Sequence, residues 1–459
     1  MDNIFFLSCF LPLTLAAHWL IPSLKGKNAA LLVFSLLFYS LGGWSALLLL
    51  IAVALVNYLL GLLLKQGKCK KIALIAGLVL DLGFLGFFKY ADFLLSGILG
   101  LPALQTGLAV PLGISFFTVK CISYLMDAHR DPEQATTSFP KLLLFVSFFP
   151  QITMGPITRF RDFGPQLENR TLTLNKTVQG LQRFAMGLGK KIILAGTIAA
   201  VADGVFALET VDIRLAWVGT IAYCLQLYFD FSGYIDMVVG LGNCFGFETC
   251  ENFNYPYIAT TVGGFWRRWH MSLSTWFKDY LYIPLGGNRK GNPRAGINKS
   301  IVFLLCGLWH GAAWTFILWG IWHGLFSLLE SMNVIPAKRL SAGKGRIIGH
   351  IYTLLVVGIG FVMFRATTVE QGLQMIGAMF TGFRFTAAGT VALHRLLNAE
   401  TLPVMAAGIL LSTPVFPKLR ARLGESARWL WSVVALVILA LCVIKMAAGD
   451  FAPSIYAQF

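Results

Sequence analysis

The feature that most constrains this 459-residue chain is a succession of apolar runs, each about as long as a helix that crosses a lipid bilayer. A transmembrane helix needs about 20 mostly apolar residues. The clearest runs lie near residues 4–21, 29–42, 45–64, 72–88, 109–126, 140–155, 215–240, 301–330, 347–364 and 430–447. Weaker runs lie near 92–104, 180–206, 370–382 and 403–412. The pattern predicts an all-α, polytopic transmembrane bundle of roughly eleven spans.

The composition agrees with a lipid environment. Residues of the types Ala, Val, Ile, Leu, Met, Phe, Trp, Tyr and Cys make up 57% of the chain against 13% charged residues, and the mean hydropathy is +0.71. These values exclude an ordinary soluble domain of this length. A helical membrane bundle of this size can be one unit, so we expect residues 1–459 to form a single integral-membrane domain.

The basic residues lie in short connectors rather than on one soluble face. The chain carries a formal charge of +16, which in a soluble protein would suggest a nucleic-acid partner. Here the cations interrupt apolar runs, as in the cluster Lys65, Lys68, Lys70 and Lys71. Cytoplasmic loops that face anionic lipid have this character. We therefore expect membrane lipid and no nucleic acid as a partner, and a phosphate-bearing substrate would be drawn to the same face.

One segment, residues 243–299, is too polar to span lipid, yet it is crowded with aromatic residues. Within it, residues 263–282 contain no proline, and aromatic and apolar residues recur at steps of three and four: Trp266, His270, Leu273, Phe277 and Tyr280. This spacing predicts an amphipathic helix that lies in the membrane interface or packs inside the bundle. A solvated surface helix is the alternative.

His310 lies between apolar runs, in the sequence Trp309-His310-Gly311. An ionisable group at such a position is costly and indicates function. A desolvated imidazole stays neutral near pH 7 and can act as a general base on a hydroxyl. The alternative is a structural histidine that bonds a backbone carbonyl and ties two helices together.

A second Trp-His-Gly sequence contains His323, thirteen residues after His310. On an unbroken helix this spacing means about 20 Å of rise and about 220° of rotation. Unless the helix breaks, the two rings cannot share a metal or a substrate. We therefore expect a structural role for His323.

A polar stripe marks the run 215–240. Tyr223, Gln226, Asp230 and Tyr234 share one face of an otherwise apolar helix. Such a stripe faces protein or water. It either lines a cavity or forms a hydrogen-bonded helix contact. Asp236 is about 240° round from Asp230, so the two carboxylates are not expected to form an acid and base pair.

Several families of soluble enzyme are excluded by missing motifs. The chain has no Walker A loop, no Gly-x-Ser-x-Gly elbow and no His-Glu-x-x-His sequence. Its eight cysteines show no Cys-x-x-Cys spacing. We therefore expect no metal site.

The most distinctive motifs are Asn252-Phe-Asn254-x-Pro256-Tyr257, Phe265-Trp-Arg-Arg-Trp-His270-x-Ser-Leu-Ser-x-Trp276, Tyr280-Leu-Tyr-Ile-Pro-Leu-Gly-Gly287 and Trp309-His-Gly311 with Trp314. Further motifs are Pro111-Leu-Gly-Ile-Ser-Phe-Phe-Thr118, Phe149-Pro-Gln151 with Gly155-Pro156-Ile-Thr-Arg159, and Phe229-Asp-Phe-Ser-Gly-Tyr234. In these motifs and their order the chain resembles the membrane-bound O-acyltransferase family. The likeness is strongest to the bacterial branch that modifies alginate, peptidoglycan and teichoic acid.

This resemblance, which covers about residues 110–325, implies a catalytic core over that range and a ring of helices around a central cavity. It implies a multi-pass protein of the bacterial cytoplasmic (inner) membrane, with no permanently bound cofactor. Acetyl-CoA or another acyl thioester would enter as co-substrate from the cytoplasm. An extracytoplasmic partner resembling a serine esterase would place the acyl group on a polysaccharide acceptor. His310 matches the family's catalytic histidine, and His270 matches its second characteristic polar position.

The resulting hypothesis is that His310 takes a proton from an acceptor hydroxyl as that hydroxyl attacks the thioester. His270, with Asn254 or Asp230, would position the thioester or bind the oxyanion. The residues expected at the donor or substrate site are Asn252, Asn254, Asp230, Tyr234, Trp266, Arg267, Arg268, Trp276, Lys278, Trp309 and Trp314. The cations among them, with Arg289 and Lys290, would attract donor phosphates or lipid headgroups.

Two alternatives remain at this point. One is D-alanyl transfer to teichoic acid from a carrier protein, which shares the same motifs. The other, from a different class, is a polysaccharide-related transporter, since polar residues within the membrane also mark transport pathways. Transporters often have two related halves, and no other segment of the sequence resembles residues 243–325.

Overall fold

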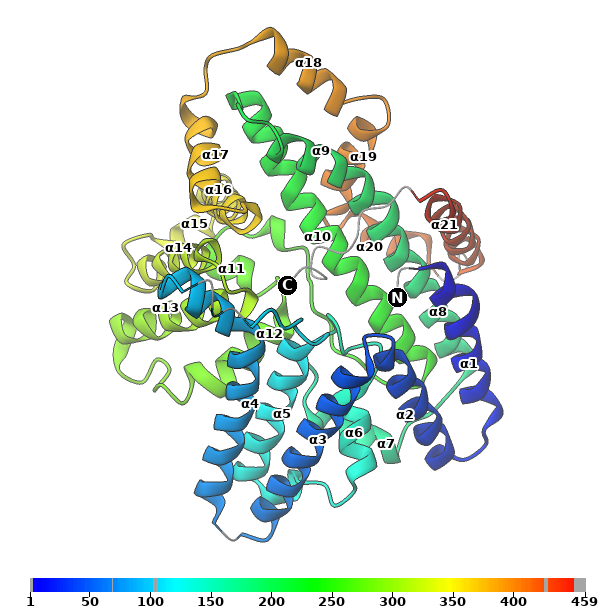
Figure 1. Ribbon diagram of the computed structural model, residues 1–459. Coiled ribbons are helices and arrows are strands. Elements are labelled where there is room, and N and C mark those ends of the chain that lie inside the picture. Colours follow the sequence, from blue (N-terminus) through cyan, green and yellow to red (C-terminus); the bar gives the residue numbers. More distant parts are fainter. Residues whose placement is uncertain (1–2, 68, 102–103, 105, 425–427, 450–459) are drawn as a thin grey trace. The chain divides into compact units, whose positions relative to one another are not determined.

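The helical class is confirmed in a computed structural model of the chain, shown in Figure 1. The structure describes residues 3–67, 69–101, 104, 106–424 and 428–449, and within these ranges every regular element is a helix. The chain divides into two compact units, residues 1–184 with 237–250 and residues 185–236 with 251–459. The division falls within two helices, α8 (Leu174–Gly189) and α10 (Ile213–Cys244). The expected single domain and the ring around a central cavity stay predictions.

The first unit begins with apolar helices and ends with two shorter ones. Its elements before α8 are η1 (Phe6–Phe10), α1 (Leu11–Leu20), α2 (Leu24–Ser40), α3 (Trp44–Lys65), α4 (Lys70–Asp92), η2 (Phe93–Ile98), α5 (Ile114–Arg130), η4 (Pro132–Gln134), α6 (Phe139–Ser147) and α7 (Phe160–Glu168). Helices α3, α4 and α5 pack side by side (Figure 1).

Two of the sequence motifs meet in this unit. Gly113 precedes α5 with a φ of +71°, and a Cβ atom there would stand 2.1 Å from the carbonyl oxygen of Ile152. The amine of Lys120 donates to the carbonyl of Phe145 at 3.0 Å and to Oε1 of Gln151 at 3.2 Å. The motifs around residues 111–118 and 149–159 therefore hold each other in place.

The second unit carries the remaining elements. They are η5 (Lys190–Ala195), α9 (Gly196–Phe206), η6 (Pro256–Ile258), α11 (Val262–Trp266), α12 (Met271–Phe277), η7 (Lys278–Tyr282), α13 (Gly291–His310), α14 (Trp314–Ser331), α15 (Ala337–Leu340), α16 (Gly345–Arg365), α17 (Val369–Thr381), α18 (Ala387–Leu396), α19 (Thr401–Leu411), α20 (Val415–Leu423) and α21 (Arg428–Ala447).

Two segments that the sequence predicts as continuous helices are broken. The apolar run 301–330 forms α13 and α14, which are separated at Gly311–Ala313. The expected helix over 263–282 forms α11, α12 and η7, with a break at residues 267–270. Periodicity alone could not show these breaks, because neither segment has a proline at the point where it breaks.

Within the described residues, five helical stretches are long and apolar enough to cross a membrane: Trp44–Lys65, Lys70–Ile98, Leu174–Phe206, Gly345–Arg365 and Trp429–Ala447. The bent pair α19 and α20 would make a sixth. This is fewer than the roughly eleven predicted. Helix α10 is long enough, but its stripe with Gln226 and Asp230 lowers its hydropathy, and the run 301–330 is divided.

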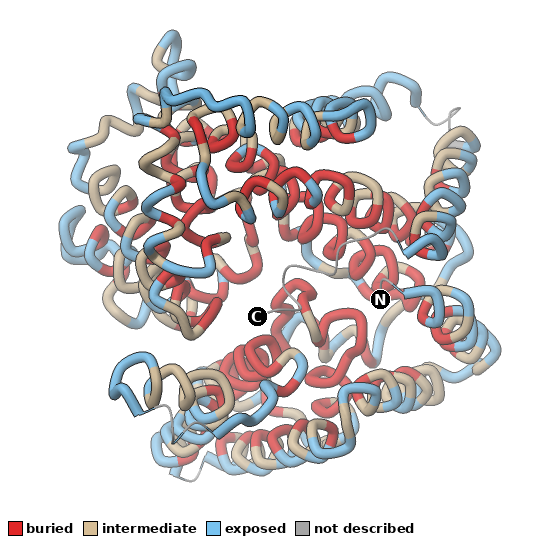
Figure 2. Tube along the Cα trace, turned by 45° about the horizontal axis from the view of Figure 1, so that its top comes forward, coloured by how far each residue is buried: buried red, intermediate tan, exposed pale blue. Residues whose placement is uncertain are grey.

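The faces of these helices fit a lipid solvent. Only 17% of the apolar window in α21 and 22% of that in Lys70–Ile98 are buried within the protein, and large apolar side chains such as Leu436 and Val79 are more than 60% exposed. Figure 2 shows such exposed turns beside helices that are buried along much of their length. Contiguous apolar faces of this extent are unfavourable in water. The chain is therefore a multi-pass membrane protein. Lys68 of the basic cluster lies outside the described residues.

One residue of the polar stripe of α10, Asp230, forms a helix contact. The buried carboxylate of Asp230 pairs with the buried amine of Lys191 in η5. Six residues further on, Asp236 pairs with Lys190 at 2.6 Å in a partly exposed position. The two carboxylates have different lysine partners, which agrees with the prediction that they do not form an acid and base pair.

We expect Asp230→Asn to lower the free energy of unfolding by roughly 3–5 kcal/mol, because it removes the carboxylate partner of a buried ammonium. Asp236→Asn is the matched control on the same helix, and because its pair is partly exposed it should cost at most about 1 kcal/mol. Thermal unfolding of the two purified variants in one detergent measures the difference. Equal losses of stability would show that burial does not determine how much the Asp230 pair contributes to the free energy of unfolding.

Candidate active site

The site begins with the tight packing of α13 against α14. Glycines on both helices make this approach possible. A Cβ atom at Gly307 would stand 2.3 Å from the carbonyl oxygen of Phe316, and one at Gly320 would stand 2.6 Å from that of Phe303. Any larger residue would push the helices apart. The break at Gly311 therefore folds the chain back on itself and leaves His310 as the last residue of α13.

His310 is 5% exposed and lies among aromatic rings. Its ring centroid is 5.1 Å from that of Trp309, 5.3 Å from that of Trp319 and 5.2 Å from that of Phe364 in α16. Each pair meets edge to face. These walls are large and apolar, so the imidazole sits in a medium of low polarity.

The break between the helices also changes the relation between His310 and His323. Their rings are not 20 Å apart along one helix, since the ring of Trp319 contacts both, at 5.3 Å from His310 and 5.1 Å from His323. A Cβ atom at Gly360 would stand 2.4 Å from Nε2 of His323, so this imidazole is packed directly against α16. The expected structural position of His323 agrees with this packing, although the reason given from helix geometry was wrong.

His270 lies at the break between α11 and α12. Its backbone is left-handed, with a φ of +44°, and it is 2% exposed. For a residue other than glycine this conformation costs about 1–2 kcal/mol, so the surrounding contacts must hold it. Its ring packs edge to face on Phe231 of α10 at 4.8 Å and lies 6.4 Å from Trp309. Trp309 thus lies between the two histidines.

Asn252 provides those contacts. Its Oδ1 accepts from the backbone N–H of Ser272 at 2.9 Å and lies 3.4 Å from Nδ1 of His270. Its backbone carbonyl accepts from the N–H of Met271 at 3.0 Å. The sequence hypothesis placed Asn254 or Asp230 beside His270. The nearby asparagine is Asn252, whereas Asn254 is exposed and exchanges backbone contacts with Arg268.

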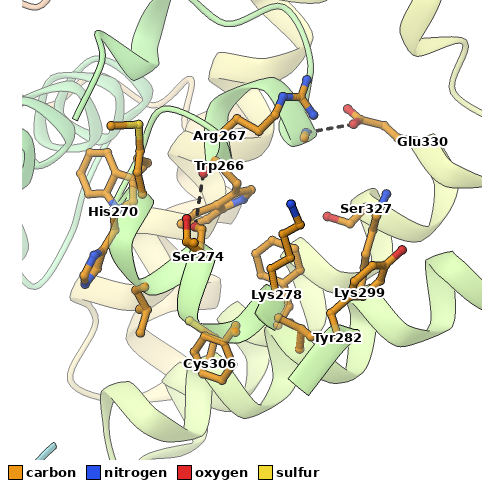
Figure 3. Close-up of a pocket in the computed structure, with 18 of the residues that line it drawn as sticks. Trp266, Arg267, His270, Ser274, Lys278, Tyr282, Lys299, Cys306, Ser327 and Glu330 are labelled. Carbon is orange, nitrogen blue, oxygen red and sulfur yellow. Dashed lines mark hydrogen bonds between the residues drawn. The ribbon is translucent and has the colours of Figure 1, made fainter. Parts of the chain in front are cut away.

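His270 and His310 line one cavity of about 550 Å³. This volume lies within the range of small-molecule sites. Five predicted site residues are in its lining, namely Trp266, Arg267, His270, Lys278 and His310. Figure 3 shows Arg267 and Glu330 at one end of the lining and Cys306 at the other, with Lys278 between them.

The sequence analysis missed six polar lining residues, Ser274, Thr275, Tyr282, Lys299, Ser327 and Glu330. The sequence contained a signal that could have predicted Lys299 as a lining residue. It precedes His310 by eleven residues, three turns of helix, and with Phe303 and Cys306 it shares the His310 face of α13. Glu330 accepts from the backbone N–H groups of Val262 and Gly263 at 2.6 and 2.9 Å, and so fixes the start of α11.

The other predicted donor-site residues lie outside the lining. Asp230 pairs with Lys191, and Tyr234 is buried in α10. Trp276 is buried and packs on Tyr280 at 5.3 Å. Trp314 is 51% exposed at the start of α14. The remaining predicted residues that the cavity does not include are Asn252, Asn254, Arg268, Trp309, Arg289 and Lys290.

Comparison with known proteins shows the family to which the chain belongs. Residues 31–334 match the sequence model of the MBOAT, membrane-bound O-acyltransferase, family. The chain belongs to this family. It is 37% identical to a "probable alginate O-acetylase" of Pseudomonas putida over 99% of both chains. It is 35% identical to a peptidoglycan O-acetyltransferase of Helicobacter pylori, over 82% of this chain and 78% of the relative. A teichoic acid D-alanyltransferase of Bacillus subtilis is 32% identical over 44% of this chain and 54% of its own length.

The protein is therefore an enzyme, an O-acyltransferase, and the alternative of a transporter is set aside. Among the described residues, no three His, Cys, Asp or Glu side chains are grouped so that they could hold a metal ion.

Burial sets the protonation state of one cavity histidine in the acyltransferase. Removal from water lowers the pKa of His270 from its usual 6.5 to about 3. The ring is therefore neutral over the whole physiological range. An imidazole that stays neutral has one nitrogen that donates and one that accepts.

This pKa has a consequence for stability. Between pH 6.5 and about 3 the unfolded chain binds a proton at position 270 that the folded chain does not bind, so stability falls as the pH is lowered through this window. One such group contributes a slope of up to about 1.4 kcal/mol per pH unit. We expect His270→Gln to lose less stability than the parent protein between pH 7 and pH 5. Thermal unfolding at both pH values measures this, with His394→Gln on the exposed side of α18 as the control. Parallel losses in all three proteins would contradict the assignment of a neutral His270.

Proposed function

We propose that this enzyme transfers an acyl group, normally acetyl, from a thioester to a hydroxyl within the cavity lined by His270 and His310. The hydroxyl oxygen forms a bond to the acyl carbon, and the bond from that carbon to sulfur breaks. His310 takes the proton from the hydroxyl and returns it to the departing thiolate. Atoms and charges balance with an ester and a thiol as products, and no cofactor is retained.

The observation that carries this proposal is that the two histidines line one cavity of about 550 Å³. The rings of Trp319 and Phe364 around His310 limit the access of water. A neutral imidazole in such a site is suited to general-base catalysis, which typically contributes a factor of about 10²–10⁴.

The cations of the same lining support a donor that carries phosphate. Arg267, Lys278 and Lys299 come from three different elements, yet all border this cavity. A coenzyme or carrier-protein arm that ends in an acyl thioester combines an anionic phosphate with an apolar chain. We propose that the phosphate binds these cations on the cytoplasmic side while the thioester extends toward the histidines.

The relatives support the nature of the acceptor. Two of them are named for O-acetylation of alginate or peptidoglycan, and one of these aligns with 99% of this chain. The D-alanyltransferase covers only 44%. We therefore propose acetyl transfer, in the bacterial inner membrane, toward a cell-envelope or secreted polysaccharide. An extracytoplasmic partner resembling a serine esterase would accept the group at the outer face.

His310→Ala should lower acyl transfer by about 10²-fold or more, since it removes the proposed base. The assay is transfer of labelled acetyl from acetyl-CoA by the purified protein in lipid vesicles, with charged carrier protein as the second donor tested. His394→Ala, on exposed α18, should keep normal activity. Near-normal transfer by a correctly folded His310→Ala protein would refute the role of this residue. Labelling only from a D-alanyl carrier would refute acetyl transfer.

Lys278→Gln combined with Lys299→Gln should raise KM for the donor about tenfold at low salt and change kcat little, because the two cations bind a part of the donor far from the reacting bond. The increase should shrink in high salt, where exposed charges are screened. Arg289→Gln, an exposed cation outside the lining, is the control. If that control raises KM as much, the effect comes from the charge of the membrane face and not from the cavity.

A further inference from the structure

The side chain of Asn252 has a fixed orientation. Its amide oxygen, not its nitrogen, faces the start of α12, because the backbone N–H of Ser272 donates to Oδ1 at 2.9 Å. Nδ1 of His270 lies 3.4 Å from this same oxygen. A carbonyl oxygen only accepts hydrogen bonds. Nδ1 is therefore the nitrogen that carries the proton.

The other ring nitrogen of His270 is then an acceptor. A neutral imidazole with a proton on Nδ1 has a free electron pair on Nε2. Within the part of the chain that the structure describes, Nε2 is buried and has no hydrogen-bond partner. The rings that pack on the imidazole, Phe231 and Trp309, meet it edge to face. A buried acceptor that lacks a donor is costly, which makes this atom a place for a donor brought by a ligand.

We propose that Asn252 is a positioning residue that holds His270 with its proton on Nδ1, so that Nε2 accepts a hydrogen bond from a donor group of the substrate in the cavity. This donor is a second O–H or N–H group of the acceptor, beside the hydroxyl that attacks, because the single proton of the attacking hydroxyl goes to His310. This inference rests on the proposed function and alters one part of the sequence hypothesis. A nitrogen with a free electron pair repels an oxyanion, so His270 orients the acceptor and does not stabilise the negative charge.

The backbone supports the same assignment. Asn252 contacts three consecutive residues, His270 through Nδ1 and Met271 and Ser272 through their N–H groups. The left-handed conformation of His270 turns its side chain toward Asn252 at the point where α12 begins. Holding the backbone alone would need only the two N–H contacts. The position of Oδ1 beside the ring also determines which nitrogen of His270 carries the proton.

The direct test is nitrogen NMR of the full-length protein in lipid, with ¹⁵N-labelled histidine. The chain has seven histidines, and the signal absent from His270→Gln identifies residue 270. We expect a proton on Nδ1 and an unprotonated Nε2 at pH 7. Asn252→Asp should keep this state, because a carboxylate oxygen also accepts from Nδ1 and from Ser272. A proton on Nε2 in the parent protein would overturn the proposal.

Activity of the same variants separates positioning from a purely structural role. Asn252→Ala should lower kcat by about 10²-fold, the cost of misplacing a reacting group by about 1 Å, while Asn252→Asp should recover most of that loss. Both variants lack the amide, so rescue by Asp isolates the acceptor oxygen. If Asp and Ala lower kcat equally while the NMR state of His270 is unchanged, Asn252 only holds the backbone and the proposal fails. The NMR result does not depend on acyl transfer, so a failure of the proposed function would appear separately, in the His310→Ala assay.

Discussion

The close approach of α13 and α14 is the contact on which the cavity depends. Gly307 and Gly320 place the backbone of each helix against the other, and Gly324 adds a third near contact, with Ser300. The chain must then reverse direction within three residues, 311–313. This reversal sets His310 at the end of a helix beside Trp319 of the next one. The Trp-His-Gly sequences are thus packing motifs as well as carriers of histidine.

The second constraint is the cost of burying polar groups. Three sets of contacts place polar atoms against specific partners. They are the pair of Lys191 with Asp230, the contacts of Glu330 with the start of α11, and the contacts of Asn252 with the start of α12. In an apolar interior each partner restricts where the other can lie. These pairs fix α10, α11 and α12 to their neighbours, and the cavity lining follows from that placement. The histidines are therefore held by contacts that lie largely outside the cavity.

The sequence was sufficient for the class of fold and for the two histidines that line the cavity. The fold class rested on the length of the apolar runs, and His310 on the rarity of an ionisable residue between them. His270 was predicted from the resemblance of its motif to the family. The breaks at residues 267–270 and 311–313 were not predicted, because they depend on contacts between distant segments. The phase of Trp266, His270 and Leu273 fits one helix, and only the contacts of Asn252 explain why the backbone leaves it. Asp230 shows the same limit of prediction from sequence. Its polarity was noted, but its partner Lys191 could not be found without the packing of η5 on α10.

A cavity for the proposed reaction must admit a thioester and a hydroxyl while limiting water, since water also has an O–H group and would hydrolyse the donor. The residues of this lining differ in a way that would meet both needs. Lys278 and Arg267 are exposed and can exchange bound anions with solvent. The same lining contains the aromatic residues Trp266, Trp269, Phe277 and Phe303, whose apolar rings offer water few hydrogen bonds. A substrate with a charged head and an apolar arm can occupy such a gradient along its whole length, whereas a water molecule that moves inward gives up its hydrogen bonds. Under the proposed function, selectivity for a hydroxyl brought by a bound acceptor would follow from the aromatic walls as much as from the imidazole.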